Sequence, residues 1–359
     1  MFGDKHIQVG AGRYIQCRGA IDRAGEEMVF FGKTAYLLYG DEVVREKTCE
    51  KLEKSLEKAG ITCRWEIFEG PSTQKSFDEV AARVKAADVD IVAGIGGGRI
   101  IDIAKAAGDM AGASVFTIPT SAATCAAYAV LYVVYGEDGN VDHSGFMNRE
   151  ICGVIVDTDI VVGDCPKRYF ISGIVDAMAK MPEFRFTMDH LKEEGMIATS
   201  EIATKIANFT YYKYLKDTET ALQDFDENKD NMLVDDMVNM NIMLTGMVSD
   251  LSTGGKQLAI AHNFYDAVCY LYKDVRKRYL HGEIVAMALP LQLAVNGNTE
   301  DEITELKEFL RGIGIPVSIR AAGVPEESLE ELITYIHQVT IPEDMELRQQ
   351  IRDGFRYIM

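Results

Sequence analysis

The sequence lacks the cysteine pattern of a disulfide-stabilised or zinc-ribbon protein. Its seven cysteines are odd in number and scattered along the chain, and no CxxC pair occurs among them. Disulfide frameworks and structural zinc ribbons instead show paired cysteines at short, regular spacings. Neither is expected here, and free thiols in a reducing cytosol fit this pattern better.

Long apolar runs are also missing. No stretch reaches the ~20 apolar residues that a membrane helix needs, and the opening MFGDKHIQVGAGRYIQ has no apolar core of signal-peptide length. Anions outnumber cations, which gives a formal net charge of −19 and would repel the phosphates of nucleic acid. The sequence therefore predicts a soluble cytoplasmic protein with no membrane or nucleic-acid partner.

The length of 359 residues favours two domains, because a domain has ~150 residues. In the first half, short apolar runs alternate with amphipathic stretches, and this βαβα order predicts a parallel sheet covered by helices. The predicted strands are Ala35–Tyr39, Ile61–Phe68, Asp90–Ile95, Ser114–Ile118, Ala129–Tyr135 and Gly153–Asp157.

After Cys165-Pro166 the pattern becomes almost entirely helical, with helices expected at Met196–Tyr214, Asn231–Met247, Gln257–Tyr272 and Glu283–Val295. We therefore expect an α/β domain in residues 1–165 and an all-α domain in residues 166–359.

A cluster of glycines marks a candidate phosphate site. Gly94–Lys105 reads GIGGGRIIDIAK, so an apolar strand leads through three consecutive glycines into a helix. Glycines let a ligand approach the backbone closely, and a helix N-terminus offers free N–H groups to a pyrophosphate. The spacing differs from the Rossmann GxGxxG, and a tight strand-to-helix turn without a ligand remains the alternative.

Polar residues near this turn support a nucleotide. Asp41 follows an early strand, where a carboxylate can accept from a ribose hydroxyl. Thr120 follows the strand after the glycines, at the sheet edge where such proteins bind ligands. Asp102 and Lys105 lie one helical turn apart, and their alternative interpretation is a surface ion pair of little energetic value.

Five segments occur in an order that resembles a known family: GGGRIIDIAK, IPTSAAT, IVDTDIV, ISGIVDAMAK and YLHGEIVAMAL. Together with the opening VGAGRYIQCRGAIDRAGE, they are similar to the glycerol dehydrogenase branch of the iron-containing alcohol dehydrogenases, over residues 8 to 295. The resemblance implies the dehydroquinate synthase-like fold, with an α/β nucleotide-binding domain and a helical domain. It implies NAD or NADP contacts for Asp41, Gly96, Gly97, Gly98, Arg99, Asp102, Thr120, Leu131 and Tyr135.

The resemblance also implies a divalent metal, Zn²⁺ or Fe²⁺, held by one aspartate and two histidines. Asp176 in SGIVDAMAK matches the aspartate and His281 in YLHGE matches one histidine. The family segment LAAAHAVHN corresponds to LAIAHNFYD here, which makes His262 the other ligand. Aligning the two HN pairs instead would put Ala259 at the ligand position and His262 beside it.

Each of these three residues also has an ordinary structural interpretation. A lone histidine is often a satisfied residue on a buried helix face, and an aspartate often serves a helix first turn. His281-Gly282 could simply begin a helix. An aspartate with two imidazoles is nevertheless a sensible open site for Zn²⁺ or Fe²⁺.

Two departures from the family pattern concern the substrate. Glycerol dehydrogenases have STDAP after the proline-threonine, with an aspartate that contacts the polyol, whereas this chain has Cys125 at that position. A thiol cannot accept from two hydroxyls as a carboxylate does. Ala123 replaces a hydroxyl residue at a nucleotide contact. Cys125 and Lys105 are the candidate substrate residues, although Cys125 could be no more than a small buried residue.

The resemblance implies an NAD(P)-dependent oxidation of a small polyol or secondary alcohol to its ketone, or the reverse, with the metal polarising the substrate oxygen. A glycerol-1-phosphate dehydrogenase-like enzyme, a dehydroquinate synthase-like lyase and a non-catalytic nucleotide-binding member remain alternatives. A phosphorylated substrate would call for basic residues, for which Lys256, Lys273, Arg276, Lys277 and Arg278 are candidates. We expect a homo-oligomer that acts on a small alcohol or ketone.

Overall fold

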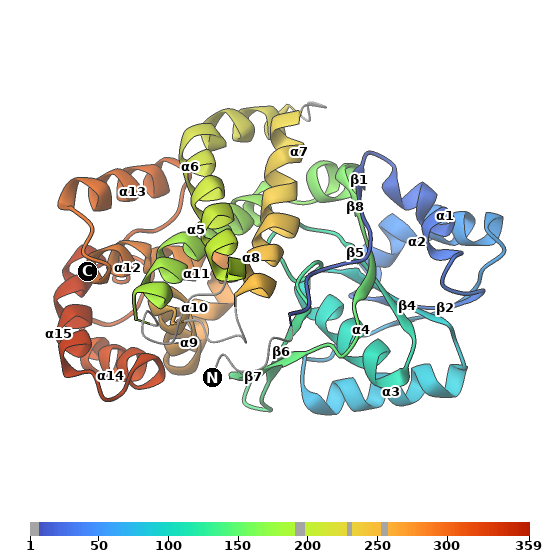
Figure 1. The fold of residues 1–359 in the computed structure, drawn as a ribbon, viewed down its shortest axis with the longest axis horizontal. Helices are drawn as coiled ribbons and strands as arrows, with labels where there is room; N and C mark the ends of the chain where they lie inside the picture. The colour runs from blue at the N-terminus through green and yellow to red at the C-terminus, as the bar shows by residue number, and fades with distance from the viewer. Residues whose placement is uncertain (1–6, 191–197, 228–231, 253–257) are drawn as a thin grey trace. The chain divides into compact units, whose positions relative to one another are not determined.

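A computed structural model describes residues 7–190, 198–227, 232–252 and 258–359 (Figure 1). These residues form two compact units. One contains residues 7–170 and 221–250, and the other contains residues 171–220 and 251–359. The expected division at residue 165 stays a prediction, and the first unit also includes a helical segment from the second half of the chain.

The first unit is built on a six-stranded parallel sheet in the order β1-β8-β5-β4-β2-β3. The strands are β1 Tyr14–Cys17, β2 Thr34–Tyr39, β3 Thr62–Ile67, β4 Ile91–Gly96, β5 Ser114–Pro119 and β8 Ile151–Asp157. The central strands are largely apolar because both faces of the sheet are covered. The predicted α/β class with a parallel sheet is confirmed.

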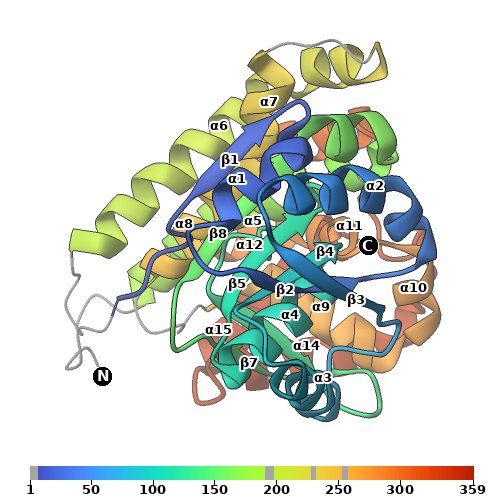
Figure 2. The same ribbon diagram turned by 90° about the vertical axis from the view of Figure 1, so that its right-hand side faces the viewer.

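Helices cover the two faces of this sheet (Figure 2). Alternate residues of the central strands, such as Leu37, Ala93 and Phe116, pack into a core with residues of α1 Ala24–Met28 and α2 Glu42–Lys58. The opposite face carries α4 Gly98–Ala111, beside α3 Gln74–Ala87. A strand has a period of two residues, so one apolar run supplies both cores.

Two short strands form a separate antiparallel hairpin, β6 Leu131–Tyr135 with β7 Val141–Phe146. The predicted strand at Ala129–Tyr135 therefore exists, but it does not belong to the parallel sheet.

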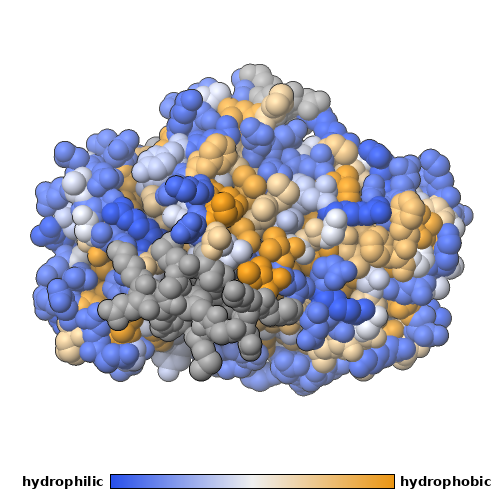
Figure 3. Space-filling model, viewed as in Figure 1, coloured by the Kyte–Doolittle hydropathy of each residue, from blue (hydrophilic) through white to orange (hydrophobic). Residues whose placement is uncertain are grey.

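The rest of the described chain is helical, as predicted. Its helices are α5 Lys167–His190, α6 Ala198–Asp226, α7 Met232–Asn239, α8 Thr245–Leu251, α9 Ile260–Leu271, α10 Lys273–Arg278, α11 His281–Met287, α12 Leu289–Val295, α13 Glu300–Gly312, α14 Leu329–Thr340 and α15 Met345–Gly354. No helix among the described residues has both the length and the apolarity to cross a membrane. The face drawn in Figure 3 is mostly hydrophilic.

Candidate functional site

The glycine cluster forms the turn from β4 into α4. Gly96 has a φ of 148°, and a Cβ there would lie 2.5 Å from Cγ2 of Ile100, so only glycine fits. Gly97 is the N-cap residue of α4, and a Cβ on it would meet nothing within 4 Å. The N–H of Ile100 donates to the carbonyl of Gly97 at 3.1 Å, whereas the N–H groups of Gly98 and Arg99 precede the first acceptor of the helix, so this turn can bind an anion.

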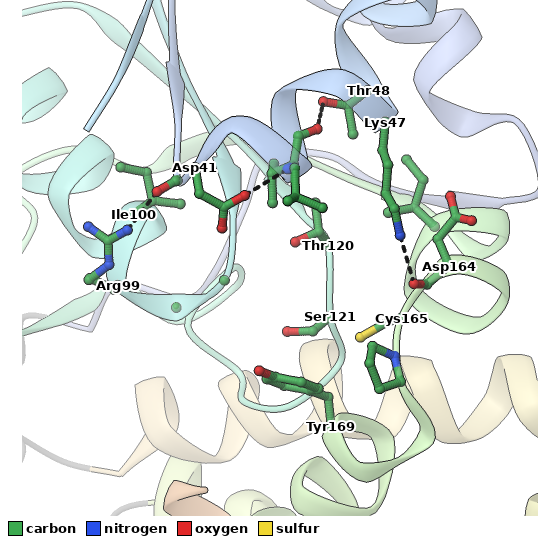
Figure 4. A pocket seen from close by; sticks show the side chains of 17 residues that line it. Asp41, Lys47, Thr48, Arg99, Ile100, Thr120, Ser121, Asp164, Cys165 and Tyr169 are labelled. Atoms are coloured by element: carbon green, nitrogen blue, oxygen red, sulfur yellow. Dashed lines mark hydrogen bonds between the residues drawn. The ribbon is translucent and has the colours of Figure 1, made fainter. Parts of the chain in front are cut away.

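A cleft of about 430 Å³ lies over this turn, a size typical of small-molecule sites. Its polar lining comes from the carboxyl ends of three neighbouring strands, with Asp41 after β2, Gly97 after β4 and Thr120 after β5 (Figure 4). The sheet order places these ends side by side, which explains why residues distant in sequence share one cleft. The far side carries Lys47, whose Nζ donates to the carbonyl of Asp164 at 3.1 Å.

Asp41 and Arg99 shape one end of the cleft. Asp41 is exposed and caps α2 by accepting from the N–H of Val44 at 2.8 Å. The Arg99 guanidinium donates to three carbonyls, those of Gly40, Phe68 and Gly70. Arg99 therefore holds the loop that ends at Asp41, which leaves the aspartate on the cleft wall.

Asp102 and Lys105 lie inside the unit rather than in the cleft. Lys105 is fully buried, and its Nζ lies 2.9 Å from Asp102 Oδ1. Burial raises the pKa of Asp102, although the charge of Lys105 lowers it. Lys105 also donates to the carbonyls of Ala126, Ala129 and Leu131. The substrate role predicted for Lys105 does not fit this environment, because its ammonium group is enclosed by protein acceptors. The surface ion pair considered as the alternative is in fact buried.

Three other predicted residues lie beside the segment that Lys105 holds. Leu131 and Tyr135 are the end residues of β6, and the N–H of Tyr135 donates to the carbonyl of Ser72 at 2.8 Å. Cys125 is half-buried in the turn before this strand. None of the three is among the described residues that line the cleft.

The second unit brings together the three predicted metal ligands. Asp176 lies within α5, His262 is in the first turn of α9, and His281 begins α11. One donor atom from each lies within 4.8 Å of the others. Nε2 of His281 is 3.2 Å and Nε2 of His262 is 3.4 Å from Asp176 Oδ1.

The motif around His281 explains how this residue reaches Asp176. A Cβ on Gly282 would lie 2.0 Å from the carbonyl oxygen of Ser172, so the glycine lets α11 pack closely against α5. The Glu283 carboxylate accepts from the N–H of Leu280 at 2.8 Å and closes the first turn of α11. The ring of Tyr265 packs edge-on against His281, with centroids 4.3 Å apart. His281 therefore begins a helix and also faces the other two side chains.

The charges of these side chains favour a cation. Burial alone would raise the pKa of the Asp176 carboxyl, but His281 and His262 hold it well below its usual range, so Asp176 is ionised. Its Oδ1 is nonetheless buried without a hydrogen-bond partner among the described residues, although two imidazole nitrogens face it. An aspartate and two imidazoles are a donor set that suits a divalent ion such as Zn²⁺ or Fe²⁺.

Glu183 is a fourth member of this cluster that the sequence did not indicate. It is fully buried, and its oxygens lie 2.7 and 2.9 Å from Nδ1 of His262. Burial would lower the pKa of His262, but the charge of Glu183 and the hydrogen bonds with Asp176 and Glu183 together outweigh that effect and raise the pKa to about 9. The only available signal was spacing: Glu183 follows Asp176 by two helical turns on α5.

The chain is similar in sequence to known dehydrogenases. Residues 11–158 match the family model of iron-containing alcohol dehydrogenases. A glycerol dehydrogenase of Thermotoga maritima is 29% identical over 90% of this chain and 86% of its own length. A glycolaldehyde reductase of Halobacterium salinarum is 28% identical over 88% of this chain and 85% of its own length.

Solved structures show the same fold. The crystal structure of a probable glycerol dehydrogenase from Sinorhizobium meliloti has a TM-score of 0.83 at 24% identity and covers 98% of both chains. Glycerol dehydrogenase from Schizosaccharomyces pombe has a TM-score of 0.85 at 22% identity, over 99% of this chain and 90% of that one. The predicted fold family is confirmed.

Proposed function

We propose that the chain is a metal-dependent NAD(P) oxidoreductase of the iron-containing alcohol dehydrogenase family, to which its matched residues and its dehydrogenase relatives are similar. Its reaction would interconvert a small polyol or secondary alcohol and its ketone. The observation that carries the proposal is the convergence of Asp176, His262 and His281 on one point. Relatives named glycerol dehydrogenase and glycolaldehyde reductase support a polyol or related alcohol as substrate.

Asp176, His262 and His281 would hold one divalent ion, Zn²⁺ or Fe²⁺. Such an ion acts as a Lewis acid on an alcohol or carbonyl oxygen. The chain contributes one negative charge and two neutral donors, which leaves the bound ion net positive and able to attract the substrate oxygen. The close packing at Gly282 and the Tyr265 ring keep the donors in place.

The cleft of the first unit would hold NAD or NADP, which carries the hydride. Gly96, Gly97 and Gly98 would place the pyrophosphate at the first turn of α4. Asp41 would accept from the ribose hydroxyls, and Thr120 supports the same assignment from the next strand. The nucleotide contacts suggested for Leu131 and Tyr135 remain predictions, and for Asp102 we propose the supporting role that its contact with Lys105 indicates.

We leave glycerol itself out of the proposal, because the resemblance places Cys125 where glycerol dehydrogenases have a polyol-contacting aspartate. A phosphorylated substrate has little support from the basic residues of α10. Lys277 pairs with Asp274, and Arg278 donates to the carbonyls of Asp274 and Ala322. Lys256 lies outside the described residues. That the protein is cytoplasmic and forms a homo-oligomer stays a prediction.

Metal content tests the proposal directly. We expect one divalent ion per chain in the wild type after dialysis against dilute zinc, measured by elemental analysis. Asp176→Ala, His262→Ala and His281→Ala should each lose stoichiometric metal, since each removes one of three protein donors. His143→Ala removes an exposed imidazole on β7 and should keep the metal.

Two results would contradict the assignment. Retention of one metal per chain by His262→Ala, with loss in the other two variants, would remove His262 from the ligand set. Absence of metal from the wild type would remove the oxidoreductase mechanism and favour a non-catalytic nucleotide-binding protein. A screen of vicinal diols, polyols and their phosphates with NAD and NADP would then identify the substrate of a metal-loaded sample.

A further inference from the structure

We propose that Glu183 is a positioning residue that selects which nitrogen of His262 faces the metal. This inference rests on the proposed metal site. It adds that Nε2 is the donor because the Glu183 carboxylate holds the proton of the imidazole on Nδ1. Glu183 would touch neither the metal nor the substrate.

The contacts of Glu183 fix both the ring and the backbone of His262. Its Oε1 accepts from the N–H of His262 at 2.8 Å and lies 2.9 Å from Nδ1, while its Oε2 lies 2.7 Å from Nδ1. Two contacts on the ring and one on the main chain leave the imidazole little freedom to rotate. Glu183 is fully buried, so water does not compete for its oxygens.

A carboxylate can only accept, so a neutral His262 beside it must carry its proton on Nδ1. The lone pair of Nε2 then points toward Asp176 Oδ1, 3.4 Å away. A proton on Nε2 or a cation would relieve the repulsion between these two acceptors, and a bound metal ion would take the place of that proton. Outer carboxylates that orient metal-bound histidines in this way also raise the basicity of the ring.

The first turn of α9 offers a matched control, because a second buried side chain supports it. Gln292 Oε1 accepts from the N–H groups of Ile260 and Ala261 at 2.8 and 3.3 Å. Gln292 is as fully buried as Glu183. Both residues therefore hold the start of the same helix, but of these two acceptors it is Glu183 that contacts the imidazole.

The test compares Glu183→Leu, Glu183→Gln and Gln292→Leu in the full chain. Zn²⁺ affinity is measured by competition with a chromophoric chelator, and the visible spectrum of Co²⁺ in the same site reports its donors. We expect Glu183→Leu to weaken zinc binding by ~10–100-fold and to change the Co²⁺ spectrum. Glu183→Gln keeps one acceptor for Nδ1 and should recover part of this loss. Gln292→Leu leaves the imidazole contact intact, so its zinc affinity should stay within about threefold of the wild-type value.

Equal zinc affinity in Glu183→Leu and the wild type would overturn the inference while leaving the metal site in place. An equal loss in Glu183→Leu and Gln292→Leu would also overturn it, since support of the helix start would then explain both. If Glu183→Leu does not fold, the near-isosteric Glu183→Gln decides: wild-type affinity and spectrum overturn the inference. A wild type that binds no metal would refute the proposed function itself.

Discussion

Replacing Lys105 with Met tests whether this residue supports the fold or contacts the substrate. Methionine has a similar length but no hydrogen to donate. The variant would leave the Asp102 carboxyl group and three main-chain carbonyls without the ammonium group that they share. Removal of one partner from a buried ion pair typically costs ~3–5 kcal/mol. We expect a loss of that size, because Lys105 is fully buried and water cannot replace it.

The single tryptophan makes this loss of stability measurable in the first unit, which also contains Lys105. Trp65 lies on β3 of the same unit, with the Arg45 guanidinium 3.7 Å from its ring centroid. Its fluorescence should follow urea unfolding of the parallel sheet. With a slope of ~2–3 kcal/mol per molar urea, the midpoint should fall by ~1–2.5 M.

Lys85→Met, at an exposed position of α3, is the control, and its free energy of unfolding should stay within ~0.5 kcal/mol of the wild type. A Lys105→Met protein that unfolds at the wild-type midpoint but has a raised KM would refute this reasoning. The lysine would then reach the substrate, as the sequence suggested.

Three further predictions concern the cleft. Gly97→Val should abolish NADH binding, measured by fluorescence titration, while the circular dichroism spectrum stays native. The valine side chain would enter open space where the phosphates approach. Gly312→Val, whose side chain also meets open space, should bind NADH normally. Asp41→Asn keeps the cap on α2 but removes a negative charge. The affinity for NADPH relative to NADH should then rise at least about fivefold, because the repulsion between the carboxylate and the 2′-phosphate is ~1 kcal/mol or more. A wild type that prefers NADPH would contradict the role of Asp41. Burial raises the pKa of Cys165 to about 11, so iodoacetamide should label this thiol slowly near neutral pH and faster as the pH rises toward that value. Because Cys165 lines the cleft, bound NADH should slow the labelling at any given pH. Mass spectrometry of the labelled peptide would show this, and rapid labelling at neutral pH would contradict the raised pKa of the thiol.

Local patterns were sufficient to predict five of the six strands of the parallel sheet, all but β1, and the glycine turn. The apolar runs of β2, β4 and β5 needed no more than their period and their flanking glycines. The position of Gly97 followed in the same way, because a strand, a glycine turn and a helix are consecutive in the sequence. The three metal ligands were predicted from resemblance, since no local pattern relates Asp176 to His281.

The missed features depend on contacts between distant segments. Glu183 and His262 are 79 positions apart, and nothing in either segment indicates that α9 begins against α5. The spacing of Asp102 and Lys105 predicted that they share a helix face. It could not show that the segment leading to β6 returns to cover that face, which turns a surface pair into a buried one.

The way in which the segment around Cys125 is attached has a consequence for how this protein can change in evolution. Lys105 binds its carbonyl oxygens, Thr117 donates to the carbonyl of Ala127, and Asn241 donates to that of Ala122. Carbonyl groups are the same in every amino acid, so substitutions between these anchor points leave the attachment unchanged. The segment can therefore acquire new side chains one at a time, and a cysteine in place of an acid is a change that the framework tolerates. If Cys125 contacts the substrate, as the resemblance implies, substrate preference would be able to change here without a change in the scaffold.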